Sequence, residues 1–253
     1  MPLIFRTNVT NAKASSRQLD ILLWLLVSVP VVVTLVTEAN KRILIWNLRV
    51  VDFLDLVLLA PFFLVTLLSL HRVVFREYPD RPTQWLSIGL IGVFMYGYAM
   101  HLTGNAINTY STEIHDYLTQ IPSDTHELIY FFDEYLSHWL LYSALFLLFG
   151  LWTVECDIYG RTWSAAASGA VLGVSYAIAI IESSQPWMGF TAAGWLLGCS
   201  IWGAHHVKVI WRKRWRTHPL TAFSTMAAIL LSLGEMTYAF IVSGFIEPSR
   251  LGM

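Results

Sequence analysis

Residues 162–183 read TWSAAASGAVLGVSYAIAIIES, a stretch with no charged residue before Glu182. A helix needs about 20 apolar residues to cross a hydrocarbon core of about 30 Å, and this stretch has that length and composition. Its small residues at four-residue spacing, such as Gly169 and Gly173, allow a neighbouring helix to approach closely in lipid. The stretch therefore predicts a helix that crosses a membrane inside a packed bundle.

Six further stretches of the chain have the same character. Pro186 cannot continue a helix, so residues 187–210 should form a separate span that follows a tight hairpin. The predicted spans cover residues 19–38, 51–75, 84–107, 128–154, 162–183, 187–210 and 219–246. We therefore expect an all-α fold, a polytopic transmembrane helix bundle of about seven spans.

The composition supports a membrane protein with one domain. Of the 253 residues, 56% are hydrophobic and 13% are charged, whereas a soluble domain carries about 25% charged residues. No polar segment is long enough to fold separately, so we expect a polar cytoplasmic segment at 1–18 and one transmembrane domain at 19–253, with an outer loop at 108–127. The net charge of -1 does not point to a nucleic-acid partner, and we expect none.

The distribution of Lys and Arg predicts the orientation. With seven spans, 12 of these residues fall on the side of the N-terminus and 4 on the other side. Positive residues stay on the cytoplasmic side, so the N-terminus should be inside and the C-terminus outside, in a cytoplasmic (inner) or plasma membrane. Besides the bilayer itself, we expect anionic lipid head groups as partners of the last basic loop. Its basic residues are Lys208, Arg212, Lys213, Arg214 and Arg216.

Ionisable residues inside the predicted spans mark a candidate site. An Asp, Lys or Arg at the centre of a span costs roughly 2.5–3.5 kcal/mol on insertion scales, so such residues need a reason to be there. His101 and Asn105 share one face of the third span, and Glu134 and His138 share one face of the fourth, because each pair is spaced i,i+4. Their depths agree, so we predict one shared polar site in the outer half of the bundle.

These residue types predict two kinds of chemistry. Two His with a carboxylate are a recurrent ligand set for Zn or non-haem Fe, which makes His101, Asn105, Glu134 and His138 candidate metal ligands. The carboxylates of Asp133 and Glu235 are the candidate catalytic acids or bases. The alternative is structural, because buried His, Glu and Asn side chains also pair to hold membrane helices together.

The sequence MHLT at residues 100–103, followed by Asp133-Glu134, resembles the ceramidase-like (CREST) superfamily over about forty residues. Members of this superfamily are seven-helix membrane hydrolases that hold zinc with three His and use a nearby Ser and Asp. The resemblance implies that His101 binds a metal and that Asp133 is the catalytic acid or base. The chain departs from the family at Gly97, where the family has its Ser. The last span offers Glu235 instead of the family's paired His.

Three functions follow from the sequence. The first is a metal-dependent hydrolase of a lipid substrate near the outer leaflet, in which the metal activates water and Asp133 or Glu235 moves protons. The second is a proton-coupled transporter in which the same His and carboxylates form a relay. The third is a subunit of a larger complex with other membrane proteins, where His residues bind haem or pigment or are structural.

Overall fold

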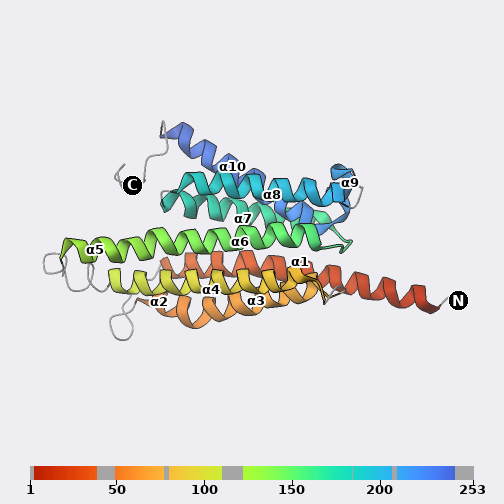
Figure 1. The fold of residues 1–253 in the computed structure, drawn as a ribbon, viewed down its shortest axis with the longest axis horizontal. Helices are drawn as coiled ribbons and strands as arrows, with labels where there is room; N and C mark the ends of the chain where they lie inside the picture. The colour runs from red at the N-terminus through yellow and green to blue at the C-terminus, as the bar shows by residue number, and fades with distance from the viewer. Residues whose placement is uncertain are drawn as a thin grey trace.

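The structure is a computed structural model that describes residues 3–38, 49–76, 80–109, 122–183, 185–206 and 210–242. Every regular element in these ranges is a helix (Figure 1). The elements are α1 (Leu3–Glu38), α2 (Val50–Leu54), η1 (Asp55–Leu59), α3 (Ala60–Val74), α4 (Pro82–Thr109), α5 (Ser123–Tyr130), η4 (Phe131–Leu136), α6 (Ser137–Glu155), α7 (Thr162–Glu182), α8 (Pro186–His206), α9 (Trp211–Thr217) and α10 (Pro219–Ile241). Both η elements are π-helical turns inside longer helices.

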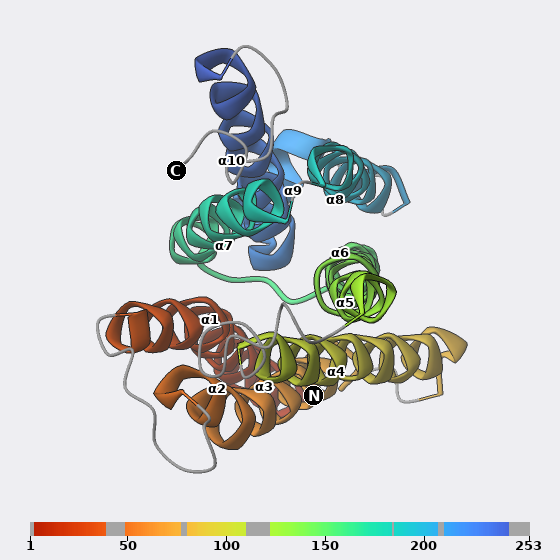
Figure 2. The ribbon, with the colours of Figure 1, turned by 90° about the vertical axis from the view of Figure 1, so that its left-hand side faces the viewer.

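The long helices run side by side in two groups. Viewed along the bundle, α1, α3 and α4 form one group, and α7, α8 and α10 form the other (Figure 2). Helix α6 joins the groups because it packs on α4 and also on α8, while α10 packs on α7 and α8. We call the two ends of the bundle the α5 end and the α9 end, after the short helices that lie there (Figure 1).

The expected all-α fold is confirmed, and six of the described helices are long and apolar enough to cross a membrane. They cover Ser15–Val33, Val50–Val74, Pro82–Ile107, Asp124–Glu155, Thr162–Glu182 and Pro219–Ile241. Large apolar side chains also lie on the outside of the bundle, including Val65, Ile178 and Met236, each more than half exposed. Such a surface suits hydrocarbon, and the chain has the build of an integral membrane protein.

The predicted sixth span is helix α8. It begins at Pro186, so the expected break after α7 is confirmed. At 21 residues it is about 30 Å long, but it is not among the six helices that are apolar enough to span. Glycines and polar residues such as Ser200 and His205 lower its hydropathy. The seventh crossing and the orientation therefore remain predictions.

Two of the predicted segments contain helix in the structure. The polar segment at 1–18 is largely helical, because α1 already begins at Leu3. The loop predicted at 108–127 contains the end of α4 and the start of α5, and its residues 110–121 lie outside the described ranges. The basic loop also holds a short helix, α9, that the sequence reading did not predict.

The orientation can be tested with a reporter fused to the C-terminus. Because Lys and Arg divide 12 to 4 between the two predicted sides, alkaline phosphatase at the C-terminus should be active outside the cytoplasm. A green fluorescent protein fused at the same position should then be dark after export. The opposite pattern would mean that the chain crosses the membrane an even number of times or lies in the reverse orientation.

Candidate functional site

Two glycines bring α4 into close contact with the helix formed by η4 and α6. A Cβ atom at Gly97 would lie 2.9 Å from the backbone nitrogen of Leu141, and one at Gly104 would lie 2.6 Å from Cβ of Asp133. His101 lies four residues after Gly97 and three before Gly104, so it shares their face of α4. Glycine spacing in the sequence therefore directs His101 into this helix interface.

His101 meets His138 of α6 in the interface. The centroids of the two imidazole rings are 4.7 Å apart and the ring planes are tilted by 41°. His138 is buried and His101 is partly buried. On its other side His138 stacks on Tyr142, with ring centroids 5.2 Å apart and planes within 7°. The two predicted helix faces therefore do meet.

Each imidazole has a carboxylate at its Nδ1 atom. Nδ1 of His101 is 3.1 Å from Oδ1 of Asp133, which is 1% exposed. Nδ1 of His138 is 3.6 Å from Oε2 of Glu134. The side-chain amide nitrogen of Asn105 lies 3.5 Å from Nε2 of His101. We call these five residues, His101, Asn105, Asp133, Glu134 and His138, the histidine cluster.

Several buried polar atoms of the histidine cluster lack a hydrogen bond of good geometry among the described residues. Among the described residues, Nδ1 of His101, Nδ1 of His138 and both carboxylate oxygens of Asp133 are buried and make no hydrogen bond of good geometry. Buried polar atoms in proteins are normally paired. Their state here is typical of a site that takes up a proton, a water molecule or another ligand.

Acidic residues of the site lie in π-helical turns. Asp133 and Glu134 belong to η4, and Asp55 begins η1 and interacts electrostatically with His101. A π turn inserts one extra residue into a helix and often occurs at functional sites. The backbone carbonyl of Asp133 accepts a hydrogen bond from the hydroxyl of Ser137. That of Glu134 accepts one of 3.0 Å from the amide of Gln185.

Among the described residues, Glu235 makes no hydrogen bond to the histidine cluster. Glu235 lies on α10, is fully buried, and has its carboxyl group against Gly189 of α8. Tyr142 and Gln185 also contact the histidine cluster, and neither was predicted as part of the site. Tyr142 could have been found, because it lies four residues after His138 on the same helix face. Gln185 comes from a distant part of the chain, and no local spacing points to it.

The predicted metal site can be compared with the arrangement of its candidate ligands. Two His with carboxylates are the correct donor types for Zn or Fe. In the part of the chain that the structure describes, however, no three His, Cys, Asp or Glu residues are grouped so that they could hold a metal ion. Nε2 of His101 faces the amide of Asn105 instead. The metal stays a prediction, and the residues as arranged do not form a complete ligand set.

Arg214, in the basic segment at the α9 end, was predicted to bind lipid head groups, and this prediction is wrong. Arg214 is fully buried and cannot reach a lipid head group. Its guanidinium group donates hydrogen bonds to the carbonyl oxygens of Gly203, Thr153 and Cys156, which lie at the ends of α8 and α6. Burial lowers the pKa of Arg214, but a guanidinium stays charged in proteins. Arg214 is therefore a structural cap for two helices.

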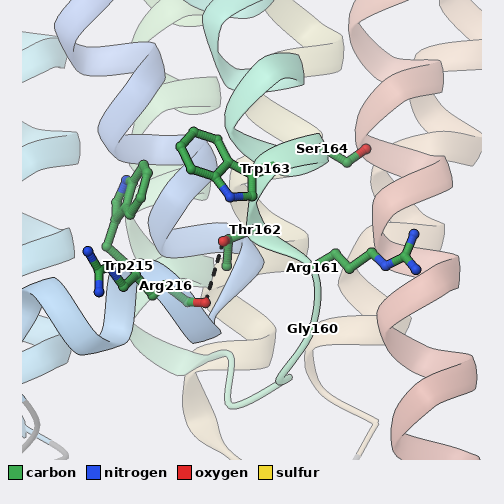
Figure 3. A pocket seen from close by; sticks show the side chains of 7 residues that line it. All are labelled: Gly160, Arg161, Thr162, Trp163, Ser164, Trp215 and Arg216. Atoms are coloured by element: carbon green, nitrogen blue, oxygen red, sulfur yellow. Dashed lines mark hydrogen bonds between the residues drawn. The ribbon is translucent and has the colours of Figure 1, made fainter.

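The other predicted head-group ligands have the exposure that lipid contact requires. Arg212, Lys213 and Arg216 are exposed, whereas Lys208 lies outside the described ranges. Beside α9 the surface forms an open hollow of about 780 Å³ (Figure 3). Its lining residues are Gly160, Arg161, Thr162, Trp163, Ser164, Trp215 and Arg216. We call it the tryptophan hollow.

The tryptophan hollow joins the start of α7 to the end of α9. Its two indole rings lie edge to face, with centroids 5.6 Å apart (Figure 3). The hydroxyl of Thr162 donates a hydrogen bond of 3.4 Å to the carbonyl of Arg216. Arg161 and Arg216 are both exposed and extend to opposite sides of the hollow. Arg161 was not predicted as part of this basic surface, because Arg161 lies fifty residues before the start of α9 in the sequence.

Comparisons of the chain with protein-family models, with curated proteins and with solved structures gave no match. The function proposed below therefore depends on the chemistry of the residues themselves.

Proposed function

We propose that the chain is a membrane protein that takes up and releases protons at the histidine cluster, as proton-coupled transporters do. One observation carries this proposal, namely two imidazole rings 4.7 Å apart with a carboxylate at the Nδ1 atom of each. Imidazole is the side chain whose charge changes most readily near neutral pH. Ionisable groups within membrane spans are expensive and mark proton relays.

Electrostatics limits the histidine pair to one extra proton. Two positive charges 4.7 Å apart repel each other by about 3.5 kcal/mol at an effective dielectric constant of about 20. One imidazolium, in contrast, is attracted by Asp133 next to His101 or by Glu134 next to His138. A proton added to the pair is thus stabilised on either ring and can pass between the two helices.

Proton transfer should be lost when one imidazole is replaced. In liposomes that contain the purified protein and a pH-sensitive dye, His138→Gln should reduce the proton flux driven by a pH gradient at least tenfold. Glutamine keeps a polar side chain in place but cannot be protonated. The matched control is His205→Gln, because His205 is exposed in the last turn of α8. The proton flux of this variant should equal that of the wild type. Equal fluxes in wild type, His138→Gln and empty liposomes would contradict the proposal.

A metal-dependent hydrolase is the second candidate, and the resemblance to the ceramidase-like superfamily implies it. The supporting observation is that a carboxylate lies at Nδ1 of each imidazole, since such carboxylates commonly orient His residues that bind metals through Nε2. Metal analysis of the purified protein separates the two candidates. Zinc or iron at one equivalent, lost in His101→Ala and His138→Ala, would favour the hydrolase. A Soret absorption band would favour a haem-binding subunit.

We further propose that the tryptophan hollow and α9 contact anionic lipid head groups. The exposed guanidinium groups of Arg161 and Arg216 flank two tryptophan rings there. Tryptophan prefers the membrane interface, and each basic residue near an anionic surface contributes roughly 1 kcal/mol.

The head-group contact can be measured with spin-labelled lipids. The double variant Arg161→Gln/Arg216→Gln should lower the preference for phosphatidylglycerol over phosphatidylcholine by between five- and thirtyfold, because two such charges are removed. The control is Arg72→Gln/Arg76→Gln, which removes the same charge from two other exposed residues. If both double variants lowered the preference equally, the hollow would have no special role.

A further inference from the structure

Glu235 is a buried acid with no partner among the described residues. Its side chain is 0% exposed, and neither carboxyl oxygen makes a hydrogen bond there. It is the only Asp, Glu, Lys or Arg of α10, and α8 has none. Of the other helices that pack on α10, α6 and α7 have no Lys or Arg, and their acids are Glu155, at the far end of α6, and Glu182, at the end of α7. The basic residues of α9 (Arg212, Lys213, Arg214 and Arg216) lie beside the start of α10, which is sixteen residues before Glu235. Helices α6, α7, α8 and α10 therefore supply no Lys or Arg that could pair with Glu235.

Small residues make the space for this acid. A Cβ atom at Gly189 of α8 would lie 2.7 Å from Oε1 of Glu235, so any larger residue there would displace the carboxyl group. Gly234 precedes Glu235 in α10. A Cβ atom added at Gly234 would lie 2.6 Å from Cβ of Ala177 of α7, so these two helices are in close contact. Close packing of α7, α8 and α10 thus encloses the carboxyl group of Glu235 in apolar surroundings.

The space beside Glu235 is one helical turn from a contact of the histidine cluster. Gln185, which precedes α8, donates its amide hydrogen bond to the backbone carbonyl of Glu134. Gly189 lies four residues further along, on the same side of the helix. The start of α8 therefore touches both the π turn η4 and Glu235.

We propose that Glu235 is a second proton-binding site, a carboxylic acid that carries a proton in the packed bundle and exchanges it when the start of α8 moves. A carboxylate without a partner in an apolar interior is so costly that the group binds a proton instead. Movement of α8 would open the contact with Gly189 and expose the acid to water. The inference rests on the proposed function in one respect, namely that the histidine cluster is the group with which Glu235 exchanges its proton.

Infrared spectroscopy measures the proton on Glu235 directly. In lipid nanodiscs at neutral pH, the wild-type protein should show the carbonyl stretching band of a protonated carboxylic acid, and Glu235→Gln should lose it. The matched control is Glu182→Gln, because Glu182 is exposed at the end of α7, and this variant should keep the band. A band that survives in Glu235→Gln would overturn the inference.

Chemical labelling provides a second measurement on the unmodified chain. Dicyclohexylcarbodiimide reacts with protonated carboxyl groups in apolar surroundings, so peptide mapping should show at least tenfold more label on Glu235 than on Glu182. Absence of label on Glu235 together with absence of the infrared band would overturn the inference. His138→Gln should keep both signals even though it loses proton flux, so failure of the second site is distinguishable from failure of the histidine cluster.

Discussion

Gly104→Ala should destabilise the protein by about 3 kcal/mol and disrupt the histidine cluster. The added Cβ atom would lie 2.6 Å from Cβ and 2.9 Å from Cα of Asp133. A side-chain end could rotate away, but a backbone atom cannot, so α4 and η4 must separate. Overpacking of a well-packed interior costs typically 1–3 kcal/mol, and contact with backbone atoms places this substitution at the upper end. Thermal unfolding in detergent measures the loss of stability.

The same helix offers a matched control for Gly104. A Cβ atom at Gly92 would meet no heavy atom within 4 Å, so Gly92→Ala should leave stability unchanged or raise it slightly, because alanine is the better helix former. Proton flux should fall in Gly104→Ala, since separation of the helices moves His101 away from His138. Equal stability of the two alanine variants would show that α4 does not pack on η4 as described.

Arg214→Met should destabilise the protein by at least about 3 kcal/mol. The guanidinium of Arg214 donates to three backbone carbonyl oxygens at the ends of α6 and α8 and, through Nε, to the hydroxyl of Thr221 at 3.2 Å. Methionine fills a similar volume but leaves these acceptors buried and unpaired, and each unpaired buried group costs about 1–3 kcal/mol. The lost positive charge also stabilised the negative ends of the two helix dipoles.

An exposed residue of the same short helix is the control for Arg214. Arg212→Met removes the same charge from α9 where the side chain is exposed, so its unfolding temperature should stay close to that of the wild type. Arg214→Lys should fall between the two, because one ammonium group keeps the charge but cannot match the fork of a guanidinium. If Arg212→Met and Arg214→Met unfolded at the same temperature, Arg214 would not be the cap that the geometry describes.

The spacing of residues along one helix predicted part of the histidine cluster. The spacing of His101 to Asn105 and of Glu134 to His138 correctly placed each pair on one helix face, and the two faces meet. Spacing alone did not show that the carboxylate closest to His101 would be Asp133. That contact depends on the π turn η4, which changes the direction of the side chains within it, and on the close approach at Gly104.

For two other residues, the neighbours were found only in the structure. Glu235 was expected in the shared site because of its depth, but depth does not decide which neighbour a helix face meets, and the structure adds that its carboxyl group lies against Gly189. Arg214 belongs to a run of basic residues that reads as one exposed cluster. In the structure it turns inward, because the ends of α6 and α8 present unpaired carbonyl groups on that side.

Composition and hydropathy along the chain were enough to predict the helices and their apolar character. Length and hydropathy are local properties, so residues 162–183 were identified as a span without knowledge of their neighbours, and α7 is found at Thr162–Glu182. Which side chains meet across helices became known only from the folded arrangement. Those contacts depend on close packing between segments far apart in the chain, where one glycine such as Gly104 sets how near two helices come.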